Sequence, residues 1–269
     1  MINLRTLKSL YRTQRKARRA RKVQRLIDDG ILTFPYEYLR EKRVIIIGPA
    51  ITVNEDLELF NPNEFDIIVR MNRAFQRNAN DGTSTHIIYH NLTVDGGRAA
   101  GGLSLEQIGE QQTKYVVYPH ADPLIASRRL VRTRRLLERD GSAQLVIPDS
   151  QSYARLRKKL GGSLPTTGAV AISSILDANV KELCVVGFTF FTTGYEVEYN
   201  PAVRTREDAQ AWVRQTGLHD PNIEGRVINQ ILLDAERDGI EISLGKNVLS
   251  ALQELNGLNN ENSRSGAGK

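Results

Sequence analysis

The segment best suited to catalysis is Leu218-His219-Asp220-Pro221, where a histidine stands directly before an expected helix over 222–237. Asp220 has the residue type of an N-cap, and proline favours the first helical position. The positive end of the helix dipole disfavours a protonated imidazole, so we expect the ring of His219 to stay neutral and to accept a proton. Glu224, about one turn into this helix, is expected to orient the ring or the bound substrate. The alternative is an incidental histidine beside a helix start.

A second candidate is the run Pro165-Thr166-Thr167-Gly168, which opens an expected helix over 167–178. The free N–H groups at a helix N-terminus bind phosphate, and the hydroxyls of Thr166 and Thr167 can extend that site. The alternative is an ordinary threonine N-cap.

Three further candidates follow apolar runs. Gly48 begins the turn Gly48-Pro49-Ala50, where the lack of a side chain lets a ligand approach the backbone; a plain turn is the alternative. Asn72 can donate and accept at a base edge or a ribose hydroxyl, or it can cap a helix. His90, after the run 85–89, is predicted to contribute to the same substrate-binding site.

These residues need a sheet to bring them together. Continuous apolar runs alternate with helical stretches, which is typical of a parallel sheet covered on both faces. The runs are 44–47, 66–69, 85–89, 115–118, 144–147, 183–187 and 240–243, and the expected helices are 122–139, 150–160, 167–178, 205–215, 222–237 and 246–255. We therefore predict a Rossmann-like α/β fold with a mostly parallel sheet and helices on both faces. Ligands of such sheets bind beyond the carboxyl ends of the strands.

The chain of 269 residues is divided by charge. Residues 1–26 hold ten of its 37 Lys and Arg and no acid, so the remaining 27 basic residues face 31 acidic ones. We predict a basic amphipathic helix over 1–30, one Rossmann-like domain over 31–256 and a disordered tail over 257–269. The helix suits an anionic membrane surface, a nucleic acid or a solvated extension.

Composition limits the alternatives. Cys184 is the only cysteine, no run of about 18 apolar residues occurs, and the N-terminus lacks the pattern of a secretory signal. These features predict a cytoplasmic protein, peripheral on the inner face of a membrane if residues 1–26 bind lipid. No Asp-x-Asp stands near a strand end, so no metal and no cofactor is expected.

Taken in order, the candidate segments resemble the sialylmotifs of the animal-type sialyltransferase family. The part of the chain that resembles the large motif consists of Val44–Gly48, Val69-Arg70-Met71-Asn72-Arg73-Ala74 and Asp81-Gly82-Thr83-Ser84-Thr85-His86. The small motif resembles Pro165–Gly168 with Val185-Val186-Gly187-Phe188, and the very small motif, His-x4-Glu, resembles His219 to Glu224. The resemblance spans about residues 43–224.

The resemblance implies the sialyltransferase variant of the glycosyltransferase A-type fold. It also implies an inverting, metal-independent transfer of a 2-keto sugar acid from a CMP-sugar to a glycan or lipid-linked acceptor. His219 would be the general base, and Asn72 with Thr166-Thr167-Gly168 would hold the nucleotide. The motifs do not distinguish sialic acid from Kdo as the donor sugar.

Three departures from the family pattern point to a divergent bacterial or viral relative. Gly48-Pro49-Ala50 stands where the family has Gly-Asn-Ser, the disulfide of secretory members cannot form, and the third motif lacks its histidine. Tyr195 or an arginine is expected to take the place of that histidine beside the donor. Two other functions stay open, a nucleic-acid-binding protein that uses the basic arm and a sugar-nucleotide hydrolase.

Overall fold

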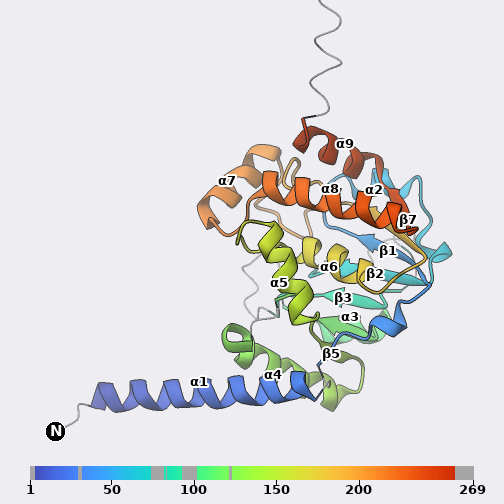
Figure 1. Cartoon of the computed structure of the whole chain (residues 1–269). Coiled ribbons are helices and arrows are strands. Elements are labelled where there is room, and N and C mark those ends of the chain that lie inside the picture. The colour runs from blue at the N-terminus through green and yellow to red at the C-terminus, as the bar shows by residue number, and fades with distance from the viewer. Residues whose placement is uncertain are drawn as a thin grey trace, which may run out of the picture.

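The computed structural model describes residues 4–29, 32–73, 82, 84–92, 102–120 and 123–257, without the side chains of 4–10 and 123–126. In this part of the chain, seven strands form one sheet in the order β5-β4-β3-β2-β1-β6-β7 (Figure 1). The strands are β1 (Arg43–Ile47), β2 (Ile67–Met71), β3 (Ile87–Tyr89), β4 (Tyr115–Val117), β5 (Gln144–Val146), β6 (Glu182–Val186) and β7 (Glu241–Leu244). Every neighbouring pair is parallel, which confirms the predicted fold class.

The strand order reverses beside β1. The chain builds the sheet outward from β1 to β5 and then returns to place β6 on the other side of β1. Ile47 at the end of β1 is level with Arg70 of β2 and Val186 of β6, so these three strands end at one edge. A reversal of this kind opens a crevice at the carboxyl ends of the strands, where such folds bind ligands.

Both faces of the sheet are covered. Val44 and Ile46 of β1 pack into a core with α5 (Ser150–Lys159), α6 (Thr167–Leu176), α8 (Pro221–Arg237) and α9 (Lys246–Leu255). Ile45 and Ile47 point to the other face, toward α2 (Val53–Leu57). Farther along that face, α3 (Leu105–Glu110) and α4 (Pro123–Asp140) cover β3, β4 and β5. Because the strands are buried on both sides, their sequences are continuous apolar runs.

The six helices expected from the sequence, including α7 (Arg206–Thr216), all form with ends shifted by at most a few residues. The short helices α2 and α3, and the 3-10 turns Tyr36–Tyr38 and Pro62–Glu64, were not predicted, because they span too few residues for a helical period to show.

The basic N-terminal segment forms α1 (Leu4–Asp28), a helix that projects well beyond the sheet (Figure 1). Its C-terminal half packs on α4 through buried Ala20 and Val23, whereas residues 11–18 are exposed on every side. None of the described helices is long and apolar enough to cross a membrane. Residues 258–269, nearly all of the predicted tail, lie outside the described part of the chain.

Candidate active site

The strand reversal brings Gly48, after β1, against Gly187, after β6. A Cβ on Gly48 would lie 2.3 Å from the Gly187 carbonyl oxygen, a distance no side chain tolerates. The Gly48 N–H donates to Val186 at 2.8 Å, so the two strand ends are locked together. Gly48 was predicted to admit a ligand to the backbone. In the structure, the space beside Gly48 is instead filled by the backbone of Gly187, at the end of the adjoining strand.

Asn72 stands at the end of β2 with a φ of 50°, a left-handed conformation that asparagine tolerates better than most residues. Its Nδ2 donates to the hydroxyl oxygen of Tyr199 at 3.0 Å, and its Oδ1 accepts from the Asn91 backbone N–H at 3.0 Å. Asn72 therefore ties two neighbouring loops together at the carboxyl edge. The Tyr199 hydroxyl keeps its own hydrogen for another acceptor.

At the end of β3, His90 and Asn91 have opposite surroundings. His90 is fully buried, and its Nδ1 accepts from the Leu92 backbone N–H at 2.8 Å. The histidine predicted to bind substrate therefore supports the strand end from inside. Asn91 is partly exposed, and its Oδ1 accepts from the Thr167 hydroxyl at 3.3 Å. Asn91, which the sequence analysis did not select, joins β3 to the start of α6.

The start of α6 forms as predicted, with Thr166 as its N-cap. The Thr166 Oγ1 accepts from the Ala169 N–H at 3.1 Å and donates to Glu224 at 2.6 Å. This hydroxyl is therefore occupied within the protein, whereas it was expected to extend a phosphate site. The Thr167 hydroxyl lies beside Asn91 and donates to its Oδ1.

Gly168, the second residue of α6, is required by packing. A Cβ there would lie 2.4 Å from Cε1 of Phe188, which follows Gly187 after β6. The aromatic ring thus lies directly against the first turn of the helix. Through this contact the end of β6 fixes where the N–H groups of α6 point.

Glu224 comes from the first turn of α8 and is 2% exposed. One carboxylate oxygen accepts from the Thr166 N–H at 2.8 Å and the other from its hydroxyl at 2.6 Å. Burial raises the pKa of Glu224 to about 7, although the two hydrogen bonds from Thr166 oppose the shift. The sequence analysis expected this carboxylate to orient His219 or the substrate. Its contacts instead fix the N-terminus of α6, so Glu224 is a positioning residue here.

His219 lies just before α8, whose start at Pro221 and N-cap at Asp220 are confirmed. Its Nδ1 is 2.7 Å from the carbonyl oxygen of Leu164. A carbonyl only accepts, so Nδ1 carries the proton and Nε2 has the lone pair that can take another. Burial lowers the pKa of His219, and the Leu164 hydrogen bond partly opposes the shift. The lowered pKa agrees with the predicted neutral ring, with burial as its main cause.

Two aromatic rings flank His219. Phe191 and Trp212 lie 6.4 and 6.5 Å from its ring centroid, with planes inclined by only 20° and 21°. Phe191 has a φ of 64°, which is strained for a large side chain and marks a backbone that the surroundings hold in place. Phe191 and Trp212 are themselves 5.9 Å apart with planes inclined by 23°, so the three rings form one nearly parallel cluster.

Tyr195 and Tyr199 border the same space, with ring centroids 5.2 Å apart. Burial raises the pKa of Tyr195 well above its ordinary value, and the charges of Tyr199 and Glu224 add to the effect. Burial likewise raises the pKa of Tyr199, opposed by the Asn72 hydrogen bond and by the charge of Arg73. Both phenols therefore stay protonated as hydrogen-bond donors near neutral pH.

His120, after β4, was not selected from the sequence. Burial, the neighbouring His219 and the charge of Arg129 lower the pKa of His120 to about 4. Its Nδ1 lies 3.2 Å from the hydroxyl of Tyr153, and Arg129 contacts the Asn91 carbonyl at 3.4 Å. The position of His120, at most a few residues after a strand end like Asn72 and Asn91, was the signal that would have identified it.

The predicted residues thus form one group at the carboxyl edge, apart from buried His90 and the packing glycines. The site offers a base at His219, neutral donors at Tyr195 and Tyr199, and amide N–H groups at the start of α6, whereas the Thr167 hydroxyl already donates to Asn91. Among the described residues, no three His, Cys, Asp or Glu side chains lie close enough to hold a metal ion.

Comparison with known proteins gave no matching family model and no matching curated protein. Among solved structures, the sialyltransferase CstII from Campylobacter jejuni in complex with cytidine-5'-monophosphate is similar at 15% identity and a TM-score of 0.48, over 78% of this chain and 87% of that one. A mammalian sialyltransferase in complex with Gal-beta-1-3GalNAc-ortho-nitrophenol is similar at 16% identity and a TM-score of 0.44, over 79% of this chain and 72% of that one.

Proposed function

We propose that the protein is a glycosyltransferase that moves a 2-keto sugar acid from a CMP-sugar to a hydroxyl of a glycan or lipid-linked acceptor, with inversion and without a metal. The observation that carries this proposal is the setting of His219. The Leu164 carbonyl holds its Nδ1–H, burial keeps the ring neutral, and Nε2 is left as a base at the carboxyl edge of the sheet.

In the proposed reaction, His219 Nε2 removes the proton of the acceptor hydroxyl as its oxygen attacks the anomeric carbon. The bond from that carbon to the phosphate oxygen breaks on the opposite face, and CMP leaves with the electron pair. The pKa of His219 is lowered by burial, so the ring is unprotonated at neutral pH and ready to accept the proton. A positioned base contributes about 10²–10⁴-fold in rate.

The donor phosphate is assigned to the start of α6. The amides of Thr167 and Gly168 come directly after the N-cap and meet a single negative charge without a cation. Glu224 and Phe188 hold this turn in place, so its dipoles are oriented before the substrate arrives. Gly48 supports the same arrangement by keeping the ends of β1 and β6 together.

The remaining donors suit the rest of the nucleotide and the sugar acid. Asn72 and Asn91 form the wall nearest to β2 and β3, which fits the ribose or the base. Tyr195 takes the place of the third-motif histidine as a neutral donor to the phosphate. Arg73, whose charge acts on Tyr199, is the cation for the donor carboxylate.

The choice of CMP follows from the sialylmotif resemblance, and either sialic acid or Kdo fits the proposal. We further propose that the protein is cytoplasmic and peripheral on the inner face of a membrane, with residues 1–26 on the anionic surface. The exposed basic stretch 11–18 of α1 supports this placement.

The test is a thermal-shift screen with CMP, UDP, GDP and ADP, followed by turnover of CMP-sialic acid and CMP-Kdo with and without acceptor glycans. We expect stabilisation by CMP alone and release of CMP that depends on the acceptor. Stronger stabilisation by UDP or ADP contradicts the donor assignment. Release of CMP that ignores the acceptor indicates a hydrolase instead.

A further inference from the structure

Four arginines form a row along the outer face of α4. They follow one another at spacings of four, three and four residues, which places them on one side of a helix. The opposite side of α4 is anchored in the core by Leu130 and Leu137, each 1% exposed. The row consists of Arg128, Arg132, Arg135 and Arg139.

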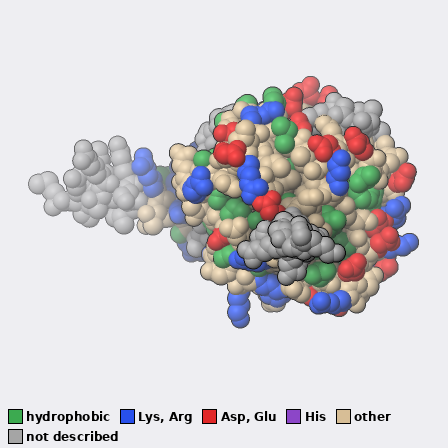
Figure 2. All heavy atoms as spheres, turned by 90° about the horizontal axis from the view of Figure 1, so that it is seen from above, with side chains coloured by type: hydrophobic (Ala, Val, Ile, Leu, Met, Phe, Trp, Pro, Cys, Tyr) green, Lys and Arg blue, Asp and Glu red, His purple; other side chains and the backbone are tan. Residues whose placement is uncertain are grey.

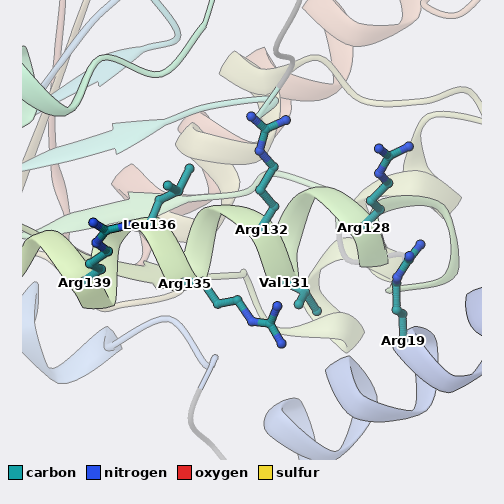
Figure 3. A pocket seen from close by; sticks show the side chains of 7 residues that line it. All are labelled: Arg19, Arg128, Val131, Arg132, Arg135, Leu136 and Arg139. Carbon is teal, nitrogen blue, oxygen red and sulfur yellow. The ribbon is translucent and has the colours of Figure 1, made fainter.

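A fifth arginine faces this row from another element. Arg19 of α1 lines, together with the row, a cavity of about 370 Å³, to which Val131 and Leu136 add apolar surface. Figure 3 shows Arg19 rising from α1 toward the end of α4 that carries Arg128. We call this cavity, lined by Arg19, Arg128, Val131, Arg132, Arg135, Leu136 and Arg139, the arginine groove.

The charge of the arginine groove is not balanced by the protein. Within the described part of the chain, none of its five arginines has an acidic partner at ion-pair distance, whereas Arg134 on another side of α4 pairs with Glu138 at 2.7 Å. Like charges three or four residues apart destabilise a helix. The row therefore has an electrostatic cost in the free protein, and a bound anion would offset it. The face of the molecule near α9 differs, because basic and acidic side chains are interspersed there (Figure 2).

We propose that the arginine groove binds the phosphate groups of anionic phospholipids and holds α1 and α4 against a membrane surface. Guanidinium groups carry a permanent positive charge that attracts phosphate. Leu136, 42% exposed, and Val131 give the groove an apolar lining that suits an amphiphile. A single-stranded nucleic acid would need aromatic side chains on which to stack bases, and none lines the groove.

Two placements fit a lipid surface. Residues 11–18 of α1 are exposed, so this part of the helix can lie along a membrane. At the other side, Arg128 precedes Arg129, whose guanidinium contacts the Asn91 carbonyl in the candidate active site. Docking through the groove therefore brings the carboxyl edge of the sheet close to the lipid surface.

The experiment measures binding of the full chain to sedimented vesicles. We compare phosphatidylcholine vesicles with vesicles that contain about a quarter phosphatidylglycerol, for the wild type and the triple variant Arg128→Gln, Arg132→Gln, Arg135→Gln. Each basic residue near such a surface contributes about fivefold, so the triple variant is expected to lose about a hundredfold in affinity. The matched control, Arg134→Gln, Arg157→Gln, Arg237→Gln, removes the same charge from other surfaces and is expected to keep most of the binding.

Two further sets of measurements, with a lysine variant and with competing ligands, can contradict the proposal. The corresponding triple lysine variant keeps the charge and should bind anionic vesicles nearly as the wild type does; loss equal to that of the glutamine variant, in protein that melts normally, overturns the assignment. An equal loss in the matched control also overturns it. Tighter binding of a duplex oligonucleotide, or displacement from vesicles by millimolar pyrophosphate, assigns the groove to a nucleic acid or to a free phosphate compound instead.

Discussion

Two regions of this molecule are suited to anions, and they use opposite chemistry. The candidate active site, between the starts of α6 and α8, presents amide N–H groups, hydroxyls and neutral rings, most of them held by internal hydrogen bonds. The arginine groove, between α1 and α4, presents five guanidinium groups, of which only Arg19 is partly buried, and none of them has an acidic partner within the described part of the chain.

The difference indicates what each region recognises. Neutral donors act at short range and only in the correct direction, so a site built from them selects one ligand geometry. Charges on long side chains attract any anionic surface over about a Debye length and impose little geometry. The site therefore suits a single phosphate in a defined pose, and the groove suits a lipid surface.

The largest expected effect is a loss of catalysis on changing the candidate active site, which a change in the arginine groove should not cause. His219→Ala removes the base, so kcat for transfer to a soluble acceptor should fall by about 10²–10⁴-fold, with CMP affinity nearly unchanged. Steady-state kinetics and calorimetry measure the two quantities. The triple glutamine variant of the groove is the control, since it should keep the wild-type kcat on a soluble acceptor. Wild-type activity in His219→Ala would refute the assignment of the base.

The second prediction concerns the buried acid that supports the site. The pKa of Glu224 is about 7 in the folded protein against 4.5 in its ordinary environment. Between these values the folded state keeps a proton that the unfolded state has released, so the free energy of unfolding falls as pH rises, by about 3 kcal/mol in all. Glu224→Gln cannot titrate and should lack this part of the slope in denaturant unfolding at pH 4.5 and pH 7. Parallel pH dependence in both proteins contradicts the raised pKa.

The third prediction compares the same substitution, glycine to alanine, at the carboxyl edge of the sheet and in a helix on one of its faces. Gly48→Ala forces a Cβ against the Gly187 backbone, and such overpacking costs about 1–3 kcal/mol of unfolding free energy. Gly109→Ala, in α3 on the face that carries α4, meets nothing within 4 Å and should stabilise by about 0.5–1 kcal/mol. Denaturant unfolding measures both. Equal changes would mean that the ends of β1 and β6 are not locked by this contact.

Much of the fold was predictable from apolar patterns. Strands buried on both faces have continuous apolar sequences, and long helices repeat their apolar residues at the helical period several times. The placement of Asn72, Thr167 and His219 at one edge followed from the parallel sheet alone. The partnership of Glu224 with Thr166 did not, since 58 residues separate them and only the packing of α8 on α6 joins them.

The arginine row shows a different limit. Its spacing along α4 was present in the sequence, but the body of the chain was judged by its net charge, in which 31 acidic residues outweigh 27 basic ones. The net charge of the whole domain does not reveal that four arginines lie on one face of a helix. Arg19 could not be assigned to that row at all, because the sequence does not state which helix lies beside α4.

The smallest expected effect is a contrast in salt dependence. In the proposed complex, CMP pairs with the amides of α6 and with neutral hydroxyls of partly or fully buried residues, where added salt screens little. Between about 0.05 and 0.2 M salt, the dissociation constant for CMP should therefore change by less than about threefold. Binding to anionic vesicles over the same range should weaken far more, because the groove acts through exposed charges. Calorimetry for CMP and sedimentation for vesicles, in the same buffers, measure the two slopes. If CMP binding weakens as steeply as vesicle binding, permanent charges such as Arg73 and Arg129 dominate the site, and its neutral donors do not set the affinity.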